Sequence, residues 1–372
     1  METSVLPFDV EAARRRRSST PQAEPPAPVT VRELAPDDYA RWDDYVRTAP
    51  DGTIHHTIAW MIAVRDTFGH KPMYLVAQRG HDWAGVLPLF RIKSLFGGTM
   101  LVSVPYAVYG GIAASDEHAV RALLRAAFCH MERERANCID LRSVKAADPD
   151  LPVNDRYLTF RRDLPDRPGD VLGKLPRKAR AAARNARNKF GLTVEFDDKH
   201  LSQVWRLYCR SMQRLGSLNY PYSFFQRLID ETPDGHLVSL IRYENRPIAG
   251  LVTFLFNGVC MPYFVGCDAR YNHTGVNNFI YLTVMERAVE LGCRTFDFGR
   301  SRRDNTGCCN FKTFQGFEPQ VMQYQCVVAP GRTAPDLTPS NPRFGLARKV
   351  WPRLPLRLTR PLGAWLSRHV PG

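Results

Sequence analysis

Residues 237–256 read LVSLIRYENRPIAGLVTFLF, the pattern of two antiparallel strands joined by a short turn, with Gly250 in the second strand. An earlier stretch, YLVAQRGHDWAGVLPLF at residues 74–90, has the same shape around Gly85. The similarity of these two stretches indicates that the chain contains two divergent copies of one structural unit.

A helix that runs into a short strand follows each copy, and each of these strands has one central Asp. The segments are MERERANCIDLRS, which contains Asp140, and ERAVELGCRTFDFGRS, which contains Asp297. Gly85 precedes Asp140 by 55 positions and Gly250 precedes Asp297 by 47, so the order and the spacing agree. Each copy is therefore predicted to run helix, antiparallel strands, helix and strand. This order gives an α/β (α+β) protein with mixed sheets flanked by helices.

The predicted organisation has four parts. Structure begins with a strand at Val29–Leu34, because the residues before it are rich in Pro, Ala, Ser and Arg and lack periodicity. The parts are a disordered segment at 1–29, a first domain at 30–165, a second domain at 166–330 and a basic tail at 331–372.

Composition excludes several classes of protein. The chain has 372 residues, of which 44% are hydrophobic and 24% charged, so it is neither collagen-like nor wholly disordered. The net charge of +14 is concentrated in two segments. Residues 161–189 hold ten Lys or Arg against three Asp, and residues 331–372 hold eight against Asp336, so each segment has net charge +7. Anionic partners are expected at these two places.

The cysteines and the apolar segments favour a cytoplasmic protein. Nine cysteines occur without a C-x-x-C pair or metal-ligand spacing, so we expect reduced thiols and no metal site. The Arg14–Arg17 run has no apolar segment after it and is not a secretory signal. The most apolar stretch, 247–266, is interrupted by Asn257-Gly258, which favours a type I′ turn, so it is predicted to form two strands and not a membrane span.

A basic helix is predicted at residues 173–191, GKLPRKARAAARNARNKFG, because the segment is rich in Ala and ends at Gly191. Its basic side chains recur every three or four residues and form one stripe, and no acidic residue within the helix pairs with them. Such a stripe favours phosphate binding, with a solvated charged surface as the alternative. The stripe consists of Lys174, Arg177, Arg180, Arg184 and Arg187.

The segment FDFGRS at 296–301 is the first candidate for catalysis. Asp297 ends a strand, Gly299 allows a sharp turn, and Arg300 follows. Asp297 could act as a general base or orient one, whereas the alternative is that it only caps the turn. A kinase interpretation of DFG fails because the chain has no Gly-rich loop and no HRD motif.

Two further segments carry candidate residues. Lys312, within FKTFQGFEP, is near Asp297 and Arg300 in sequence and could stabilise an oxyanion or a phosphate, or it could be a surface lysine with a buried stem. PYAVYGG at 105–111 offers Tyr106, Tyr109 and Gly110, which could line a pocket or form an ordinary glycine turn.

The tail mixes Arg with Leu and Trp, and Pro352, Pro355 and Pro361 exclude one long helix, so short amphipathic helices are expected. This composition is typical of segments that lie on anionic membranes. The alternative is a tail that folds back on the protein's own surface.

Several of these motifs together resemble one family. They are GTIHHTIAW, FGHKPMYLVA, GVLPLFRIKSLFGG, SVPYAVYGG, KLPRKARAAARNARNKFGL, FDFGRS and FKTFQGFEP. In this order they resemble the FemAB-like branch of the GNAT acyltransferase superfamily, and within it the FemAB-like proteins associated with exosortase/PEP-CTERM systems. The resemblance extends from about residue 30 to the end of the chain. No hydrolase, zincin, P-loop or dinucleotide-binding motif competes with it.

The resemblance implies two tandem GNAT-like domains and transfer of an aminoacyl group from aminoacyl-tRNA to an amine, without a metal or a permanently bound cofactor. It implies catalytic roles for Asp297, Arg300 and Lys312, and it places tRNA or nucleotide phosphates on the basic helix. The implied substrate-binding residues are His56, Trp60, Tyr106, Tyr109, Gly110, Arg177, Arg180, Arg184, Arg187, Tyr263 and Asn277.

The sequence departs from acetyl-CoA enzymes of the superfamily at one loop. Their Q/R-x-x-G-x-G/A pattern is missing after the PYFVGCDARYNHTGVNNF strand, where Asn277 and Asn278 stand instead. Three functions therefore remain open. They are aminoacyl or acyl transfer to an amine on a cell-envelope or exopolysaccharide-related precursor, acyl-CoA-dependent N-acetyl transfer by the same fold, and non-catalytic binding of RNA or a membrane. The expected location is the cytoplasm, or the inner face of the membrane if the tail binds it.

Overall fold

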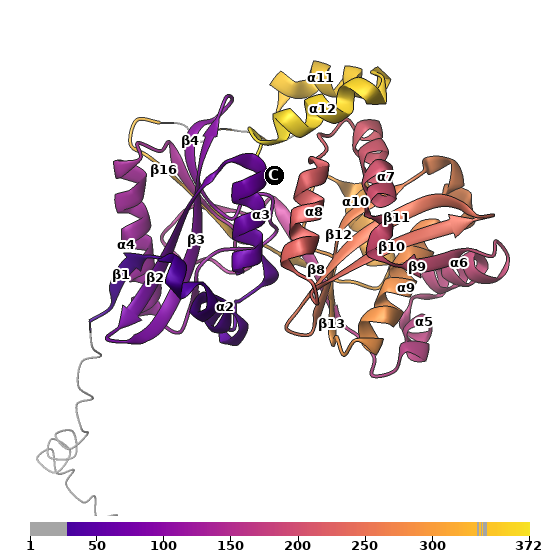
Figure 1. The fold of residues 1–372 in the computed structure, drawn as a ribbon, viewed down its shortest axis with the longest axis horizontal. Coiled ribbons are helices and arrows are strands. Elements are labelled where there is room, and N and C mark those ends of the chain that lie inside the picture. Colours follow the sequence, from indigo (N-terminus) through magenta and orange to yellow (C-terminus); the bar gives the residue numbers. More distant parts are fainter. Residues whose placement is uncertain (1–27, 333–334, 336, 338–340) are drawn as a thin grey trace, which may run out of the picture.

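The computed structural model describes residues 28–332, 335, 337 and 341–372. The segment predicted to be disordered, 1–29, lies outside the described residues except for its last two positions. Figure 1 shows two α/β units side by side, with the helices of the tail above them and the C-terminus between α3 and α8. The α/β class and the tandem duplication are both confirmed.

The first sheet has the strand order β1-β2-β3-β4-β6-β16-β7, and β5 pairs with β3. All its neighbours are antiparallel except β4 and β6, which are parallel. The strands are β1 (Thr30–Glu33), β2 (Lys71–Arg79), β3 (Asp82–Ser94), β4 (Gly98–Ser103), β5 (Ala113–Ala114), β6 (Cys138–Leu141), β7 (Val153–Asn154) and β16 (Tyr324–Val328).

The second sheet repeats this arrangement in the order β9-β10-β11-β12-β13-β8-β14, with β15 paired to β8. Here β12 and β13 form the parallel pair. The strands are β8 (Tyr157–Asp163), β9 (Thr193–Phe196), β10 (His236–Tyr243), β11 (Arg246–Phe256), β12 (Val259–Cys267), β13 (Thr295–Asp297), β14 (Ser301–Arg302) and β15 (Pro319–Val321).

The two units exchange a strand. β8 precedes the second unit in the chain but pairs with β13 in the second sheet, and β16 follows the second unit but pairs with β6 in the first sheet. The boundary predicted near residue 165 therefore separates the helices α2–α4 from α5–α10, but not the strands of the two sheets.

Helices cover both faces of each sheet. Alternate residues of β2 point to opposite faces of the first sheet. Tyr74 and Val76 belong to a core shared by the two units, whereas Met73 and Leu75 belong to a core under α4. The helices of the first unit are α2 (Tyr39–Thr48), α3 (Ile58–Phe68) and α4 (Glu117–Arg133). Those of the second are α5 (Val171–Lys174), α6 (Arg177–Asn188), α7 (Leu201–Arg214), α8 (Tyr222–Glu231), α9 (Val276–Glu290) and α10 (Thr306–Phe314).

The shared core joins the two inner sheet faces. It contains side chains from α2, α3 and β2–β4 of the first unit and from α7, α8 and β10–β12 of the second. At the contact, Phe68 of α3 stacks on Tyr106 with ring centroids 4.0 Å apart, and both rings contact Phe224 of α8. The two units are thus one packed body.

The structure differs from the sequence prediction in the basic helix. Instead of one helix at 173–191, α5 ends at Lys174 and α6 begins at Arg177. Leu175 is extended, with φ −74° and ψ 145°, because the ring of Pro176 disfavours helical geometry at the preceding residue. Lys174 therefore does not belong to the helix that carries the four arginines.

The predicted hairpin turn at Asn257-Gly258 is confirmed, since both residues have positive φ and join β11 to β12. Within the described residues, no helix combines the length and the apolar character needed to span a bilayer. All nine cysteines are free, as expected; Cys138, Cys209, Cys260 and Cys293 are buried, whereas Cys129 is exposed.

The tail forms two short helices, α11 (Gly345–Val350) and α12 (Leu356–Ser367), and Pro352 and Pro355 lie between them as predicted. Pro361, which was also expected to interrupt a helix, lies inside α12. Of the two alternatives for the tail, contact with the protein's own surface is present. Gly363 of α12 lies against Asn219, whose amide Nδ2 donates to the carbonyl of Arg360 at 3.1 Å. The last residues enter the space between the units, where the amide of Tyr106 donates to the carbonyl of Pro371 at 2.7 Å.

Candidate functional site

Two loops meet at the junction of the two sheets. One, at 104–112, follows β4, and the other, at 298–300, joins β13 to β14. Val104 and Tyr106 of the first loop both have φ of +59°, which is unfavourable for side chains with a Cβ and particularly for β-branched Val. Backbone strain of this kind is concentrated at functional sites, so this junction is a candidate functional site.

Asp297 is the centre of a buried hydrogen-bond network between the loops. Its carboxylate accepts from the Tyr109 hydroxyl at 2.9 Å and from the amide of Gly299 at 2.7 Å, and Arg161 Nε lies 3.4 Å from it. The Tyr109 hydroxyl is also 2.5 Å from Thr159 Oγ1. Burial raises the pKa of Asp297, against the opposing effects of Arg161, the Gly299 amide and Tyr109.

Lys312 of α10 supports the second loop from beneath. Its ammonium donates to the carbonyls of Phe298 and Gly299, each at 2.9 Å, and lies 3.4 Å from that of Arg300. The side chain is 6% exposed, and burial lowers its pKa to about 8. Lys312 therefore fixes the backbone that positions the Arg300 side chain.

Arg300 points into a cavity of about 840 Å³ between the two units. Its guanidinium lies over the ring of Tyr157, 4.8 Å from the centroid, and donates from Nη1 to the Tyr324 hydroxyl at 3.2 Å. Of the three residues predicted to be catalytic, Arg300 lines this cavity, whereas Asp297 and Lys312 lie behind the loop.

The inner face of the first sheet forms one wall of the cavity. Alternate residues of neighbouring strands point into it: Met100, Val102, Cys138, Asp140, Arg142, Tyr324 and Cys326. The facing wall comes from the second unit, through Tyr208 and Met212 of α7 and through Tyr220. Residues 366–372 of the tail complete the enclosure.

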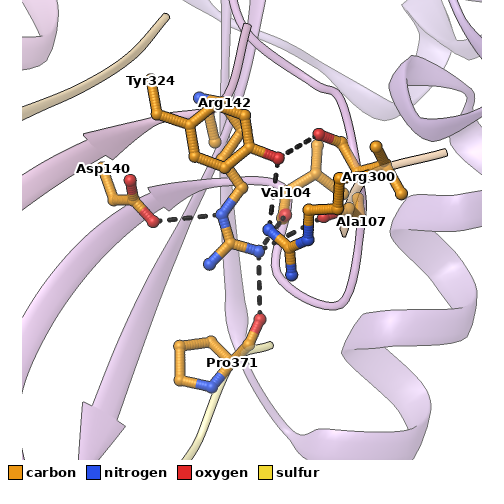
Figure 2. Close-up of polar contacts among 9 residues, drawn as sticks. Val104, Ala107, Asp140, Arg142, Arg300, Tyr324 and Pro371 are labelled. Atoms are coloured by element: carbon orange, nitrogen blue, oxygen red, sulfur yellow. Dashed lines mark hydrogen bonds and ion pairs between the residues drawn. The ribbon is translucent and has the colours of Figure 1, made fainter. Parts of the chain in front are cut away.

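Arg142 is the second arginine of the cavity and is 3% exposed (Figure 2). Its Nε pairs with Asp140 at 3.0 Å, and its Nη1 donates to the carbonyls of Val104 and Pro371 at 3.3 and 3.1 Å. Figure 2 shows Arg300 beside this group, bonded to Tyr324. Arg142 thus links the strained loop, the first sheet and the tail.

The predicted residues of the first unit divide between the site and the core. Tyr109 belongs to the Asp297 network, and Tyr106 holds the tail through its hydroxyl, which donates to the Ser367 carbonyl at 3.2 Å. Trp60 is buried in the shared core. His56 bonds through Nε2 to the carbonyl of Gly111 at 3.0 Å, and burial lowers its pKa to about 4.

Two other predicted residues lie close to these loops. Gly110 has φ of +139°, and a Cβ there would lie 2.6 Å from the Val104 side chain, so only glycine fits. Tyr263 donates from its hydroxyl to the carbonyl of Tyr106 and lies in the same aromatic cluster as His55.

Helix α6, which carries the predicted arginines, lies at the outer edge of the second unit (Figure 1). None of its residues lines the cavity. Arg177 and Arg184 are exposed and have no carboxylate partner among the described residues. Arg187 pairs with Glu286 of α9 at 2.5 Å, and Arg180 donates to the carbonyl of Gly173 at 3.2 Å. The stripe and the cavity are therefore two separate places on the molecule.

Asn277 lies in the first turn of α9, beside α6. Its side-chain oxygen accepts from the Cys267 thiol at 3.0 Å. The preceding Gly275 packs against α6, since a Cβ there would lie 2.9 Å from the carbonyl of Ala182. The basic helix thus adjoins the amino end of α9, where backbone amides favour anions.

The sequence-based prediction did not include Arg142, Arg161, Tyr157, Thr159 or Tyr324. For Arg142 a signal was present, because IDLRS of the first copy corresponds to FDFGRS of the second, and Arg142 corresponds to Arg300. The residues of β8 and β16 gave no such signal, since nothing local indicates that these strands exchange.

Comparison with known proteins identifies the fold. Residues 173–313, most of the second unit, match the family model of the acetyltransferase (GNAT) domain. No curated protein matches the sequence.

Among solved structures, the chain is similar to FemX with 15% identity and a TM-score of 0.62, covering 86% of this chain and 99% of that one. It is similar to L-PGS from Bacillus licheniformis with 10% identity and a TM-score of 0.52, covering 87% and 97%. It is also similar to a tandem GNAT protein from the clavulanic acid biosynthesis pathway with 13% identity and a TM-score of 0.52, covering 82% and 100%. At these identities the likeness shows the fold. The chain is therefore built from two tandem GNAT-like domains, and residues 173–313 in the second match the acetyltransferase (GNAT) domain.

Proposed function

We propose that this protein is an N-acyltransferase that moves an aminoacyl or acyl group to an amine on a cell-envelope or exopolysaccharide-related precursor. The observation that carries the proposal is the junction of the two GNAT-like units. There a single short loop, 297–300, connects the buried Asp297 network to Arg300 on the wall of a substrate-sized cavity.

In the proposed reaction the amine nitrogen attacks the activated carbonyl carbon of the donor. A C–N bond forms, the C–O bond of an aminoacyl ester or the C–S bond of a thioester breaks, and the amine proton leaves with the departing oxygen or sulfur. Arg300 would hold the acceptor in the geometry needed for this attack. Asp297 and Lys312 would act as positioning residues, because their contacts fix the loop that presents Arg300.

The donor is proposed to be aminoacyl-tRNA, with acyl-CoA as the second candidate. Exposed Arg177 and Arg184, without carboxylate partners among the described residues, favour a long polyanion along α6. The match of residues 173–313 to an acetyltransferase domain favours acyl-CoA. Both donors carry phosphates that could bind between α6 and the amino end of α9.

Binding of charged tRNA and of a set of acyl-CoA compounds to the purified protein separates these donors. The test variant is Arg177→Glu with Arg184→Glu, and the matched control is Arg121→Glu with Arg125→Glu on α4, which removes two exposed arginines from the first unit. Loss of charged-tRNA binding in the test variant alone supports aminoacyl transfer. Saturable binding of one acyl-CoA, unchanged in both variants, would identify an acyl-CoA enzyme. Salt-dependent RNA binding with no transfer from any donor would contradict the transferase proposal and indicate a non-catalytic RNA-binding protein.

We also propose that the tail places the protein at the inner face of an anionic membrane. Helix α12 directs small side chains inward, Thr359, Gly363 and Ser367, and large apolar ones outward. Leu358 and Trp365 are 58% and 50% exposed. This distribution is the reverse of a helix that packs on a protein core, and the surrounding arginines complement anionic lipid.

Vesicle co-sedimentation tests the membrane proposal. The protein is expected to bind vesicles that contain phosphatidylglycerol and not vesicles of phosphatidylcholine alone. Leu358→Gln with Trp365→Gln should abolish the binding, whereas Leu291→Gln, at an exposed leucine of the second unit, should not. Equal binding by both variants would overturn the proposal.

A further inference from the structure

Among the described residues, basic side chains outnumber acidic ones in the cavity lining. Arg142, Arg156 and Arg300 line the cavity, with Asp140 as the acidic residue. Asp140 pairs with Arg142 at 3.0 Å. Arg300 contacts tyrosine rings and the Tyr324 hydroxyl, and it has no carboxylate partner among the described residues.

An enclosed guanidinium without a counter-ion is unfavourable, because removing a charge from water costs free energy that only an opposite charge or hydrogen bonds recover. The stacking of Arg300 on Tyr157 holds the guanidinium plane in place while most of its donors stay available. Preorganised donors with excess positive charge suit a phosphate or a carboxylate.

Most of the remaining lining is apolar. It includes Met100, Val102, Met212, Phe344 and Trp351. Phe96 of the β3–β4 turn contacts Phe344 of the tail, with ring centroids 5.8 Å apart, and so closes this region under the tail. A small inorganic anion would leave these side chains without a partner, whereas a ligand with an apolar portion would cover them.

We propose that the cavity binds an anionic amphiphile that carries the acceptor amine, with its charged group against Arg300 and Arg142 and its apolar portion beneath the tail. The proposal deepens the proposed function, on which it rests, by naming the chemical class of the acceptor. The tail that covers the cavity also carries the outward apolar surface of α12, so such a ligand could enter from a membrane directly beneath that surface.

Calorimetric titration of the full chain without any acyl donor tests this binding. The probes are hexyl, octyl and decyl phosphate, each below its micelle concentration. Affinity should rise about four-fold for each added methylene, as expected for burial of apolar surface. Decyl glucoside, which has the chain without the charge, and inorganic phosphate, which has the charge without the chain, should both bind at least ten-fold more weakly than decyl phosphate.

Arg300→Met is the test variant and should weaken decyl phosphate binding by about 10- to 100-fold, the usual effect of losing a charged hydrogen-bond partner. Arg303→Met is the matched control. It removes a charge from the same segment, but Arg303 pairs with Asp155 at the surface and does not line the cavity, so binding should be unchanged. Met212→Gln should reduce the gain per methylene and leave the preference for phosphate over glucoside.

Several outcomes would overturn the proposal. Affinity independent of chain length would identify a soluble small anion as the ligand, and equal affinity for decyl glucoside would identify a neutral apolar ligand. An equal loss in the Arg303→Met variant would place the probe elsewhere. Transfer to a soluble amine without amphiphile binding would contradict this proposal but support the proposed transferase function. Amphiphile binding without transfer from any donor would contradict the transferase function but support the binding site.

Discussion

Arg142 and Arg300 occupy corresponding positions in the two units and line the same cavity. Each follows the central Asp of its strand, in IDLRS and FDFGRS. In the first unit that Asp, Asp140, pairs with its own arginine. In the second unit Gly299 lengthens the segment by one residue, and Asp297 bonds instead to the Gly299 amide and to Tyr109. Divergence of the two copies has thus left Arg142 paired with a carboxylate and Arg300 without a carboxylate partner among the described residues.

Replacing Tyr109 by Phe should destabilise the protein by about 1–3 kcal/mol, because Asp297 would lose a buried hydrogen-bond donor. The pKa of Asp297 should rise further, since the Tyr109 hydroxyl is one of the groups that lower it. Urea unfolding at pH 7 measures the change. Tyr74→Phe is the control, because the Tyr74 hydroxyl is buried without a hydrogen-bond partner in the part of the chain that the structure describes. The free energy of unfolding of this variant should fall by less than about 0.5 kcal/mol. Equal changes in the free energy of unfolding for the two substitutions would contradict a stabilising hydrogen bond from Tyr109 to Asp297.

Lys312→Met should lower transferase turnover by about 100-fold or more, because loss of its hydrogen bonds frees the loop that positions Arg300. Turnover is measured together with near-ultraviolet circular dichroism, which should remain native-like. Lys145→Met, at an exposed lysine of the first unit, should retain full turnover. Wild-type turnover in the Lys312 variant would show that the loop does not need this lysine.

The same lysine gives a pH dependence of stability. Its pKa is about 8 in the folded chain against a reference value of 10.5, so between these values the unfolded chain binds more protons than the folded one. Raising the pH through this window should therefore stabilise the wild type relative to Lys312→Met, and the difference should be constant below about pH 7. Urea unfolding of both proteins at pH 7, 8, 9 and 10 provides the measurement. A difference that is flat across the series would contradict the lowered pKa.

Glu244→Asn should stabilise the protein by about 0.5–1 kcal/mol, because Glu244 has φ of +48° in the two-residue turn between β10 and β11, and Asn tolerates this conformation better. The next hairpin already has Asn257 at the corresponding position. Thermal unfolding should show a higher Tm for the variant. Glu290→Asn, at an exposed helical position, should show no increase.

Residues 28–156 expressed alone should fail to fold, because the first sheet would lack β16 and leave the edge of β6 unpaired. Residues 157–372 supply β16 and should complement the first fragment when the two are produced together. Size-exclusion chromatography and cooperative unfolding of the mixture give the readout. A stable, monomeric 28–156 fragment would show that the strand exchange is not needed for the stability of the first unit.

The sequence predicted those features that local patterns control. The duplication, the hairpin turn at Asn257-Gly258 and the helix–strand segments around Asp140 and Asp297 follow from hydrophobic periodicity and turn residues. The break at Pro176 was missed although its cause is local, since proline restricts the residue before it.

The remaining features depend on contacts between distant segments. The residues of β8 and β16 predict a strand but not the sheet that it joins, so the exchange is not encoded locally. The burial of Arg142 depends on Pro371 and Asp140, and the position of Lys312 beneath Gly299 depends on how α10 packs. These relationships arise only when the two sheets come together.

The strand exchange also determines when the protein can fold during its synthesis. The ribosome completes β1–β6 long before it reaches residues 324–328, and until then β6 exposes an unpaired edge. The first half of the nascent chain must wait for the whole second half to be translated before its sheet is complete. Pausing or premature termination within the second unit would therefore release an aggregation-prone chain and not a functional first domain.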